Sequence, residues 1–293
     1  MAIKYLAGER LIGTAAERAA MSAGVPDLTS EFTCTATNAV SSPLQTCGGW
    51  KYERNNSNYT ASGKMHVTWK RASALYMSSY DLVGNGILSA AMTDQDFVLR
   101  FDITPLAASW ATGSNRFLWA GISSNALNGS QTSQDFHGVM LRGDGATAKY
   151  CGNEGTSSTL DVNWCASNDD VNIGSEWDYS TPTTYYFEII RDDGDIKINR
   201  YTNSTYGSVA DTTGVVDDVD GATGLRYIKF CSWESGSTSG EMESAVDNVK
   251  FYKEIATVPT LVLPNLPNVT IFEESDTGKI YMFDGTDTWN ETT

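Results

Sequence analysis

The segment Thr184–Tyr201 constrains the fold of this chain more than any other. Two runs rich in β-branched and aromatic residues, 184–191 and 195–201, flank an Asp-Asp-Gly sequence at 192–194. Aspartate and glycine tolerate the positive φ angles that tight hairpin turns require. The segment therefore predicts two antiparallel strands joined by a short turn.

Similar strand-like segments recur from about residue 31 to residue 254, separated by clusters of Gly, Asn, Asp and Ser. In 97–103, apolar Phe97, Leu99, Phe101 and Ile103 alternate with other residues. The abundance of aromatic residues, including 8 Trp and 14 Tyr, is typical of β-sheet proteins. The expected strands are 64–71, 96–103, 116–123, 135–142, 184–191, 195–201, 225–233 and 245–252. They suffice for an all-β fold, a two-sheet antiparallel sandwich.

The two ends differ in composition from this region. We expect a leader at 1–30, the sandwich at 31–254, a proline-rich linker at 255–268 and a small β tail at 269–293. In the leader, Thr14 is positioned to cap a short alanine-rich helix that Gly24 ends; the alternative is a disordered or docked terminus. The tail predicts two or three short strands, which are too few to be stable unless they pack on the sandwich or on another subunit.

The formal net charge of −16 argues against nucleic acid as a partner, because phosphate binding requires a basic surface. No apolar window is long enough for a membrane helix, so membrane insertion is not expected. Glu9 and Arg10 interrupt the apolar N-terminal stretch, and a secretory signal is therefore not expected either.

The five cysteines lack the spacing of a zinc site. Two alternatives follow. Disulfides Cys34–Cys47 and Cys151–Cys165 would each close a short loop and leave Cys231 as a buried thiol; otherwise all five cysteines are reduced. The spacing does not decide between them.

The order of segments from about 48 to 253 resembles the concanavalin A-like lectin/glucanase superfamily, particularly its LamG-like sandwiches. The residues that carry this resemblance are Phe97–Asp102, Phe117–Ile122, Tyr185–Tyr201, Leu225–Phe230 and Val246–Tyr252. The resemblance covers about two thirds of the chain and implies a jelly-roll sandwich. The leader segment Ile12–Arg18 and the tail segment Ile271–Trp289 are similar to parts of structural proteins of tailed viruses.

The catalytic pattern of the superfamily's glucanases is missing. Those enzymes carry two catalytic carboxylates on one strand in a Glu-x-Asp-x-x-Glu type pattern. Asp94-Gln-Asp96 and Glu241-Met-Glu243 come nearest, but each lacks the third carboxylate. The chain has two histidines, too few for a multi-histidine zinc site, and they give little support to a His-dependent triad. We therefore expect a protein that is not an enzyme.

Calcium is the expected cofactor, in a structural role. Asp192, Asp193 and Asp195 supply several carboxylates within one turn, as do Asp217, Asp218 and Asp220, although neither group has EF-hand spacing and solvated turns are the alternative. By resemblance, Asp247 matches an aspartate that helps to hold a structural calcium ion in many relatives.

Three residues are candidates for binding a glycan. Trp164 and Trp177 lie in polar surroundings, where an exposed indole ring would stack on a sugar; anchoring of loops is the alternative. His137 would line a cleft, or else lie at the surface or hydrogen-bonded in the core.

Taken together, these features predict a non-enzymatic structural protein of a virion, a surface, decoration or fibre-associated component. Its partners would be other copies of itself, other virion proteins and glycans, and a virion protein that is released by lysis needs no export signal. The alternatives are a secreted or surface lectin, and a glucanase-like glycoside hydrolase that uses Asp96 or Glu243.

Overall fold

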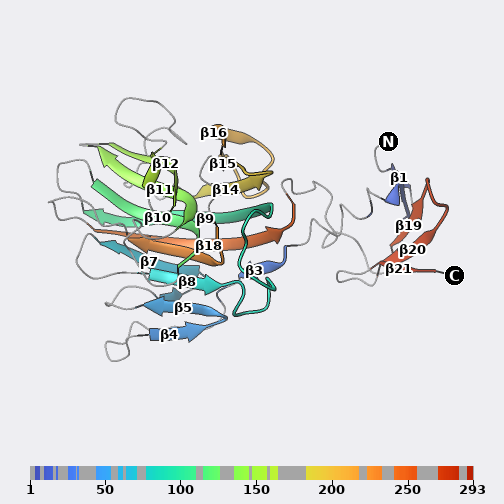
Figure 1. Ribbon diagram of the computed structural model, residues 1–293, viewed down its shortest axis with the longest axis horizontal. Helices are drawn as coiled ribbons and strands as arrows, with labels where there is room; N and C mark the ends of the chain where they lie inside the picture. Colours follow the sequence, from blue (N-terminus) through green and yellow to red (C-terminus); the bar gives the residue numbers. More distant parts are fainter. Residues whose placement is uncertain are drawn as a thin grey trace. The chain divides into compact units, whose positions relative to one another are not determined.

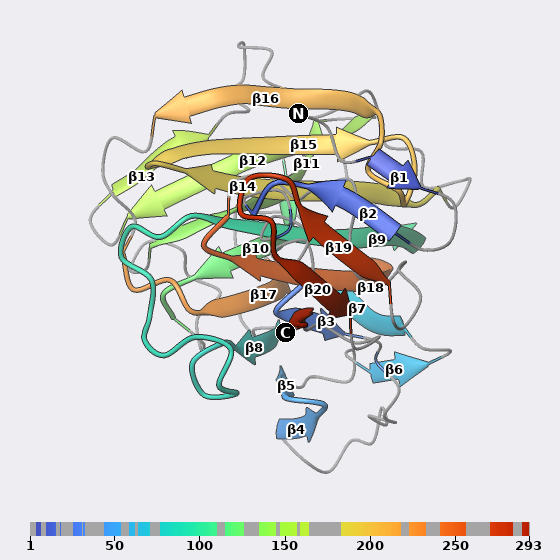
Figure 2. The same cartoon turned by 90° about the vertical axis from the view of Figure 1, so that its right-hand side faces the viewer.

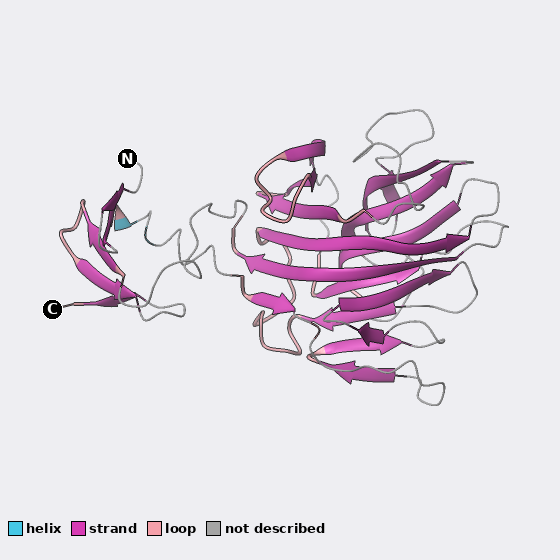
Figure 3. Ribbon diagram, turned by 180° about the vertical axis from the view of Figure 1, so that it is seen from behind, coloured by secondary structure: helices cyan, strands magenta, loops and turns pink. Residues whose placement is uncertain are grey.

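The computed structural model shows that the chain divides into two compact units, one formed by Leu28–Phe251 and one formed jointly by Met1–Asp27 and Tyr252–Thr293. Strands make up almost all of the described structure (Figure 3). No helix in the described part of the chain is long and apolar enough to cross a membrane. The structure describes residues 4–6, 10–15, 18, 26–30, 32, 44–53, 59–61, 64–70, 77–109, 115–125, 135–144, 147–156, 159–163, 183–217, 223–232, 241–255, 270–283 and 289–292.

The Leu28–Phe251 unit contains two antiparallel sheets (Figure 1). The first, called here the β9 sheet, appears in Figure 2 from β16 at the top to β6 near the bottom. Its order is β16 (Val209–Asp217), β15 (Asp195–Tyr201), β14 (Tyr185–Asp192), β9 (Phe97–Ser109), β18 (Glu241–Lys253), β7 (Lys64–Lys70) and β6 (Tyr59–Ala61), with β3 (Leu28–Ser30) paired to β18.

The second sheet, called the β10 sheet, contains strands from the same unit. Its order is β13 (Thr159–Asn163), β12 (Thr147–Thr156), β11 (Phe136–Asp144), β10 (Asn115–Ser123), β17 (Tyr227–Ser232), β8 (Met77–Asp81), β5 (Trp50–Glu53) and β4 (Leu44–Cys47). The chain crosses repeatedly between the sheets. β17 lies between β10 and β8, and β18 lies between β9 and β7, so that late strands of the sequence are inserted between early ones. This is the strand exchange of a jelly roll, and it confirms the predicted all-β, two-sheet antiparallel sandwich.

The hairpin at 184–201 forms as predicted. Asp192 pairs with Asp195 across a two-residue turn in which Asp193 has a φ of 50° and Gly194 a φ of 87°. Two successive positive φ angles define the type I′ turn, whose twist matches that of the strands it joins. The hairpin then extends the sheet, because β14 also pairs with β9 in a register that places Phe187 opposite Phe101.

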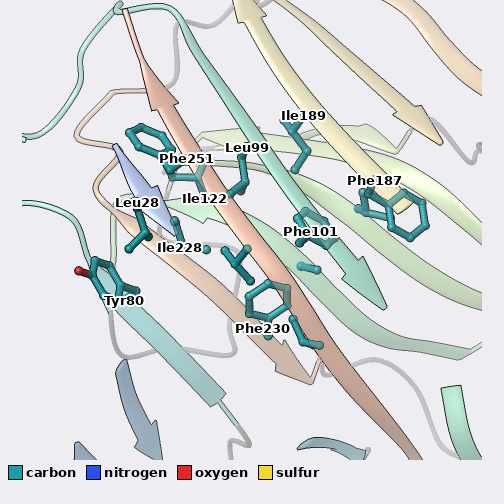
Figure 4. Close-up of a cluster of buried hydrophobic side chains, with 14 of the residues drawn as sticks. Leu28, Tyr80, Leu99, Phe101, Ile122, Phe187, Ile189, Ile228, Phe230 and Phe251 are labelled. Atoms are coloured by element: carbon teal, nitrogen blue, oxygen red, sulfur yellow. The ribbon is translucent and has the colours of Figure 1, made fainter. Parts of the chain in front are cut away.

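The core lies between the two sheets. Alternate residues of β9 and β14 are fully buried there, including Phe97, Phe101 and Phe187. The ring of Phe101 meets that of Phe230 from the β10 sheet edge to face, at 5.4 Å between centroids (Figure 4). Burial of each such side chain stabilises the fold by about 1.5–3 kcal/mol, so the sequence alternation translates directly into the packing of the sheets.

A β-bulge interrupts β18. Val246 and Val249 both belong to the core although they are three residues apart, whereas strict alternation would place them on opposite faces. The extra residue is accommodated at Asp247 and Asn248, where Asn248 has a φ of 50°. Asn248 is consequently exposed beside the strand, with its side chain available to the outer face of the sheet.

The terminal unit combines both ends of the chain in one sheet. Its order is β1 (Lys4–Leu6), β2 (Arg10–Gly13), β19 (Ile271–Glu274), β20 (Ile280–Phe283) and β21 (Trp289–Glu291). β2 and β19 run parallel, with Leu11 opposite Phe272. One face buries Leu11, Phe272, Tyr281, Phe283 and Trp289. The leader and the tail, which the sequence analysis treated as separate segments, therefore share one sheet.

The predicted leader helix is described at two positions. Ala15 and Arg18 have helical backbone, and the Arg18 amide donates a hydrogen bond to the Thr14 carbonyl at 3.0 Å. The Arg18 side chain is 2.8 Å from the buried Glu274 carboxylate, and its guanidinium lies 3.7 Å from the Tyr281 ring centroid. These contacts attach the leader to the tail.

The backbone positions of three cysteines limit the disulfide alternatives. Cys47 lies in β4, Cys151 in β12 and Cys231 in β17. At least three strand spacings, about 14 Å at roughly 4.8 Å each, separate any two of them, and disulfide formation requires Cα atoms within about 7 Å. No two of these three can pair. Cys34 and Cys165 lie outside the described residues, so the Cys34–Cys47 and Cys151–Cys165 pairs stay predictions.

Candidate functional site

A group of polar and aromatic side chains covers part of the outer face of the β9 sheet. Because Leu99, Phe101 and Ile103 face the core, the alternation of β9 places Arg100 and Asp102 on the opposite face. The strand register extends this face to β14 and β15. We call this group the Tyr206 cluster; it comprises Arg100, Asp102, Glu188, Asn199, Tyr201, Tyr206 and Asn248.

The carboxylate of Glu188 lies at the centre of one row of the cluster. It is opposite Arg100 on β9 and Asn199 on β15. One oxygen, Oε2, accepts a hydrogen bond from the Arg100 Nε atom at 2.7 Å and lies 2.7 Å from the Arg100 Nη2 atom in an ion pair. The other, Oε1, accepts from the Tyr201 hydroxyl at 2.5 Å and from the Asn199 Nδ2 atom at 3.1 Å. Three hydrogen bonds and the ion pair with Arg100 therefore engage both oxygens of the carboxylate.

One polar atom of the Asn199 side chain has no hydrogen-bond partner in the described part of the chain. Its Nδ2 atom donates to Glu188, which determines the orientation of the amide, since the carboxylate requires a donor there. The Oδ1 atom is buried and accepts no hydrogen bond from any residue that the structure describes. A buried carbonyl oxygen without a donor is costly, so Asn199 offers an acceptor for a hydroxyl group.

Asp102 lies in the neighbouring row of the cluster and is 4% exposed. Its Oδ1 atom accepts from the Tyr206 hydroxyl at 3.0 Å and its Oδ2 atom accepts from the Asn248 Nδ2 atom at 2.6 Å. Burial raises the pKa of Asp102, and the nearby Asp247 carboxylate acts in the same direction; the two hydrogen bonds oppose the rise without cancelling it. The bulge in β18 thus places the Asn248 amide on a buried carboxylate.

Tyr206 covers the cluster from the turn between β15 and β16. Its ring centroid lies 4.3 Å from the Arg100 guanidinium carbon, 5.1 Å from the Tyr201 ring and 6.4 Å from the Tyr186 ring. Burial, followed by the charge of Asp102, raises the pKa of Tyr206 well above its ordinary value. Burial and Glu188 likewise raise the pKa of Tyr201. Both hydroxyls are therefore protonated donors at neutral pH.

Of the three glycan-binding candidates from the sequence, the structure describes His137. His137 is fully buried in β11, with its ring centroid 6.5 Å from that of Phe97, and so faces the interior between the sheets. Trp164 and Trp177 lie outside the described residues. A ligand-binding role for these three residues stays a prediction.

The expected calcium ligands are only partly described. Asp217 ends β16 opposite Asp195, while Asp218 and Asp220 lie outside the described residues. The Asp247 carboxylate accepts the Asn248 amide at 2.9 Å and lies 3.6 Å from the Lys64 ammonium group, which supplies positive charge where calcium would be expected. Within the described ranges, no group of three or more His, Cys, Asp or Glu residues is arranged to hold a metal ion. Calcium binding at Asp247 stays a prediction.

None of the residues of the Tyr206 cluster is among the site residues predicted from the sequence. The available signal was the outward positions of β9 and β14: Arg100, Asp102 and Glu188 are charged residues within strands that are otherwise apolar. Tyr206 and Asn248 gave no such signal, because a turn and a bulge bring them to the sheet.

Comparisons with known proteins leave the family open. No protein-family model matches the chain, and no curated protein matches it. Among solved structures, the chain is similar to the CBM2 module of the evolved Dit of Lactobacillus casei BL23 phage J-1, with 9% identity over 80% of this chain and 97% of that one, at a TM-score of 0.43. It is also similar to the carbohydrate recognition domain of Emp47p (11% identity; 75% and 97% covered; TM-score 0.43). A third is alginate lyase A1-II' (12% identity; 68% and 84% covered; TM-score 0.40). At TM-scores below 0.5, these likenesses carry no argument about what this chain does.

Proposed function

We propose that this protein is a non-enzymatic, carbohydrate-binding structural component of a virus particle, and that the Tyr206 cluster binds the carbohydrate. The observation that carries the proposal is the chemistry of the cluster. The rings of Tyr186 and Tyr201 offer flat apolar faces beneath Tyr206. Beside them, Asn248, Arg100 and the Asn199 Oδ1 atom, which has no partner among the described residues, offer hydrogen-bonding groups of both kinds. Sugar rings combine an apolar face with peripheral hydroxyls and require this combination.

Binding is favoured over hydrolysis because neither buried carboxylate of the cluster is free to react. A glycoside hydrolase needs one carboxyl group that donates a proton and one that attacks or activates water. Glu188 accepts three hydrogen bonds and forms an ion pair with Arg100, and both oxygens of Asp102 are engaged by Tyr206 and Asn248. The cluster therefore holds its carboxylates as fixed acceptors.

The division of the chain into two units supports a role in a particle. The Tyr206 cluster, which we propose to bind carbohydrate, belongs to the sandwich, whereas the chain ends form a unit of their own. We propose that the terminal unit attaches the protein to further copies of itself or to other virion proteins. Electron microscopy of the native assembly tests this, and a soluble native monomer that never associates with particles contradicts it.

Titration calorimetry with a panel of neutral and acidic polysaccharides tests the carbohydrate proposal. Asn248→Gly removes the amide and keeps the positive φ favourable. We expect this variant to bind a polysaccharide about tenfold more weakly, as expected for the loss of roughly one hydrogen bond at a binding site. Asn290→Gly removes the amide of an exposed asparagine of the terminal unit and should leave binding unchanged.

Two results would contradict the proposal. One is that no polysaccharide binds to the wild-type protein or to any variant of the cluster. The other is the release of reducing ends from a polysaccharide, abolished by Asp96→Asn or Glu243→Gln, which would establish the glycoside hydrolase alternative.

A further inference from the structure

The turn from Thr202 to Ser208, called the Tyr206 turn, is attached to the outer face of the sheet through one side chain. Its backbone is closed on itself by hydrogen bonds from the Thr202 amide to the Ser208 carbonyl, 3.1 Å, and from the Tyr206 amide to the Asn203 carbonyl, 3.2 Å. The Thr205 amide and hydroxyl both donate to the Asn203 side chain. Within the described ranges, only the Tyr206 side chain forms a hydrogen bond outside the turn, from its hydroxyl to Asp102.

Tyr206 holds this position with an unfavourable backbone. Its φ is 54°, in the left-handed region that a bulky aromatic residue rarely occupies. Such conformations persist where surrounding contacts enforce them, and they concentrate at ligand clamps and switch regions. Here the enforcing contacts are the Asp102 hydrogen bond, the Arg100 guanidinium and the rings of Tyr186 and Tyr201.

The groups beneath Tyr206 form a cradle for a ring that carries a hydroxyl group. The Asp102 carboxylate accepts the hydroxyl, the Arg100 guanidinium lies over the ring, and the Tyr201 ring meets it edge to face. Next to them, the buried Asn199 Oδ1 atom accepts no hydrogen bond from the described residues while the turn is closed. It can therefore accept one from a ligand. The cradle therefore binds a ring now and retains an unused acceptor.

We propose that the Tyr206 turn is a lid, and that a hydroxylated six-membered ring, a pyranose residue of the polysaccharide, displaces Tyr206 from the cradle. This inference rests on the proposed function and names the way in which the site is reached. One ring hydroxyl replaces the Tyr206 hydroxyl on Asp102, and another donates to Asn199 Oδ1. Opening of the lid breaks one hydrogen bond to the sheet and releases the left-handed backbone at Tyr206.

Tyr206→Gly tests the cradle without any sugar. Glycine adopts the positive φ without strain, so this variant is expected to fold while leaving the cradle open. The probe is p-cresol, which restores the ring and the hydroxyl. It should raise the melting temperature of Tyr206→Gly and not that of the wild-type protein, and the effect should vanish in Tyr206→Gly with Asp102→Ala. The proposal is overturned if p-cresol stabilises all three proteins equally or none of them.

Polysaccharide binding tests the lid. If the wild-type site is open a tenth of the time, removal of the lid tightens the apparent affinity about tenfold. Tyr206→Gly should therefore bind the polysaccharide more tightly than the wild-type protein, and the polysaccharide should displace p-cresol. An affinity that is unchanged or weaker overturns the lid.

The two proposals fail in distinguishable ways. If p-cresol binds Tyr206→Gly in the manner expected but no polysaccharide binds any protein, the cradle is supported and the carbohydrate proposal is contradicted. If the wild-type protein binds a polysaccharide while Tyr206→Gly binds neither p-cresol nor the polysaccharide more tightly, the carbohydrate proposal is supported and the lid is overturned.

Discussion

Asp102 and Glu274 are both buried carboxylates, and their pKa values move in opposite directions. Burial disfavours the charged form of each. At Asp102 burial prevails over the hydrogen bonds from Asn248 and Tyr206 and raises the pKa. At Glu274 the hydrogen bonds from Thr277 and Arg18, together with the positive charge of Arg18, outweigh burial and lower the pKa. The balance between burial and the groups that stabilise the charged form therefore decides the direction.

The raised pKa of Asp102 predicts a defined pH dependence of stability. The folded protein holds this proton more tightly than the unfolded chain, so the stability contributed by the group is complete below the ordinary value of 3.8 and is lost as pH rises through the higher folded value. Asp102→Asn removes the titration. We expect the free energy of unfolding of the wild-type protein, relative to Asp102→Asn, to fall as pH rises from the acid range. Urea unfolding of both proteins at matched pH measures this difference, and a difference that grows with pH would refute it.

The lowered pKa of Glu274 predicts the reverse for the terminal unit. The stability that Glu274 contributes is present above its ordinary pKa of 4.5 and is lost as pH falls through the lower pKa of the folded state. Arg18→Ala leaves the carboxylate without its cation, and we expect it to destabilise the terminal unit by about 2 kcal/mol, between the effects of breaking exposed and buried pairs. Hydrogen exchange of the β19 amides measures the loss.

The control for Arg18→Ala is Lys279→Ala, which breaks the Lys279–Glu291 pair in the same sheet, where both side chains are about half exposed (49% and 48%). Hydrogen exchange of the β19 amides in this variant should differ little from that of the wild-type protein. Equal effects of the two substitutions would show that burial of the Arg18–Glu274 pair is irrelevant.

At the scale of elements, alternation of apolar residues predicted the strands that line the core. All eight expected strands are present, as β7, β9, β10, β11, β14, β15, β17 and β18. Strands with polar sequences were missed, among them β8 (Met77–Asp81) and β16 (Val209–Asp217). These strands form because they pair with neighbouring strands, and this pairing does not require alternation of apolar residues in their own sequence.

The candidate site was less predictable than the sheets for the same reason. The charges of Arg100 and Glu188 mark an outward face, but which residues meet there depends on register, and register joins residues about ninety positions apart. Asn248 reaches Asp102 because of a bulge, and Tyr206 does so because of a left-handed turn residue. Because such departures from regular geometry involve single residues, they produce no periodic pattern in the sequence from which they could be predicted.

The register of β10 and β11 also predicts a strict requirement for glycine. A Cβ atom on Gly121 would lie 2.6 Å from the Gly138 Cα atom and still closer to the His137 carbonyl oxygen. Backbone cannot move aside as a side chain does, so we expect Gly121→Ala to destabilise the sandwich by about 3 kcal/mol, as overpacking does. Denaturant unfolding measures the change. Gly207→Ala, whose added carbon would meet its nearest neighbour at 3.4 Å, is the control and should be nearly neutral; equal effects would contradict the argument.

At the scale of the whole molecule, the terminal unit depends on both ends of the chain. β19 is hydrogen-bonded to β2 on one side and to β20 on the other. The Ser275 amide donates to the Gly13 carbonyl at 2.6 Å, and the Ala15 amide donates to Asp276 at 3.0 Å. The tail alone contributes β19, β20 and β21, three short strands that are at the lower limit for independent stability.

Deletion of residues 1–18 is therefore expected to unfold the tail and leave the sandwich intact. Without β2 and Arg18, the buried face that includes Phe272 and Trp289 loses its neighbours. Limited proteolysis should then cleave within 270–292 of the shortened chain and spare this segment in the full chain, while the main thermal transition, that of Leu28–Phe251, stays at the same temperature. A tail that remains protected after the deletion would mean that its own three strands suffice. A lower temperature for the main transition would mean that the leader also stabilises the sandwich.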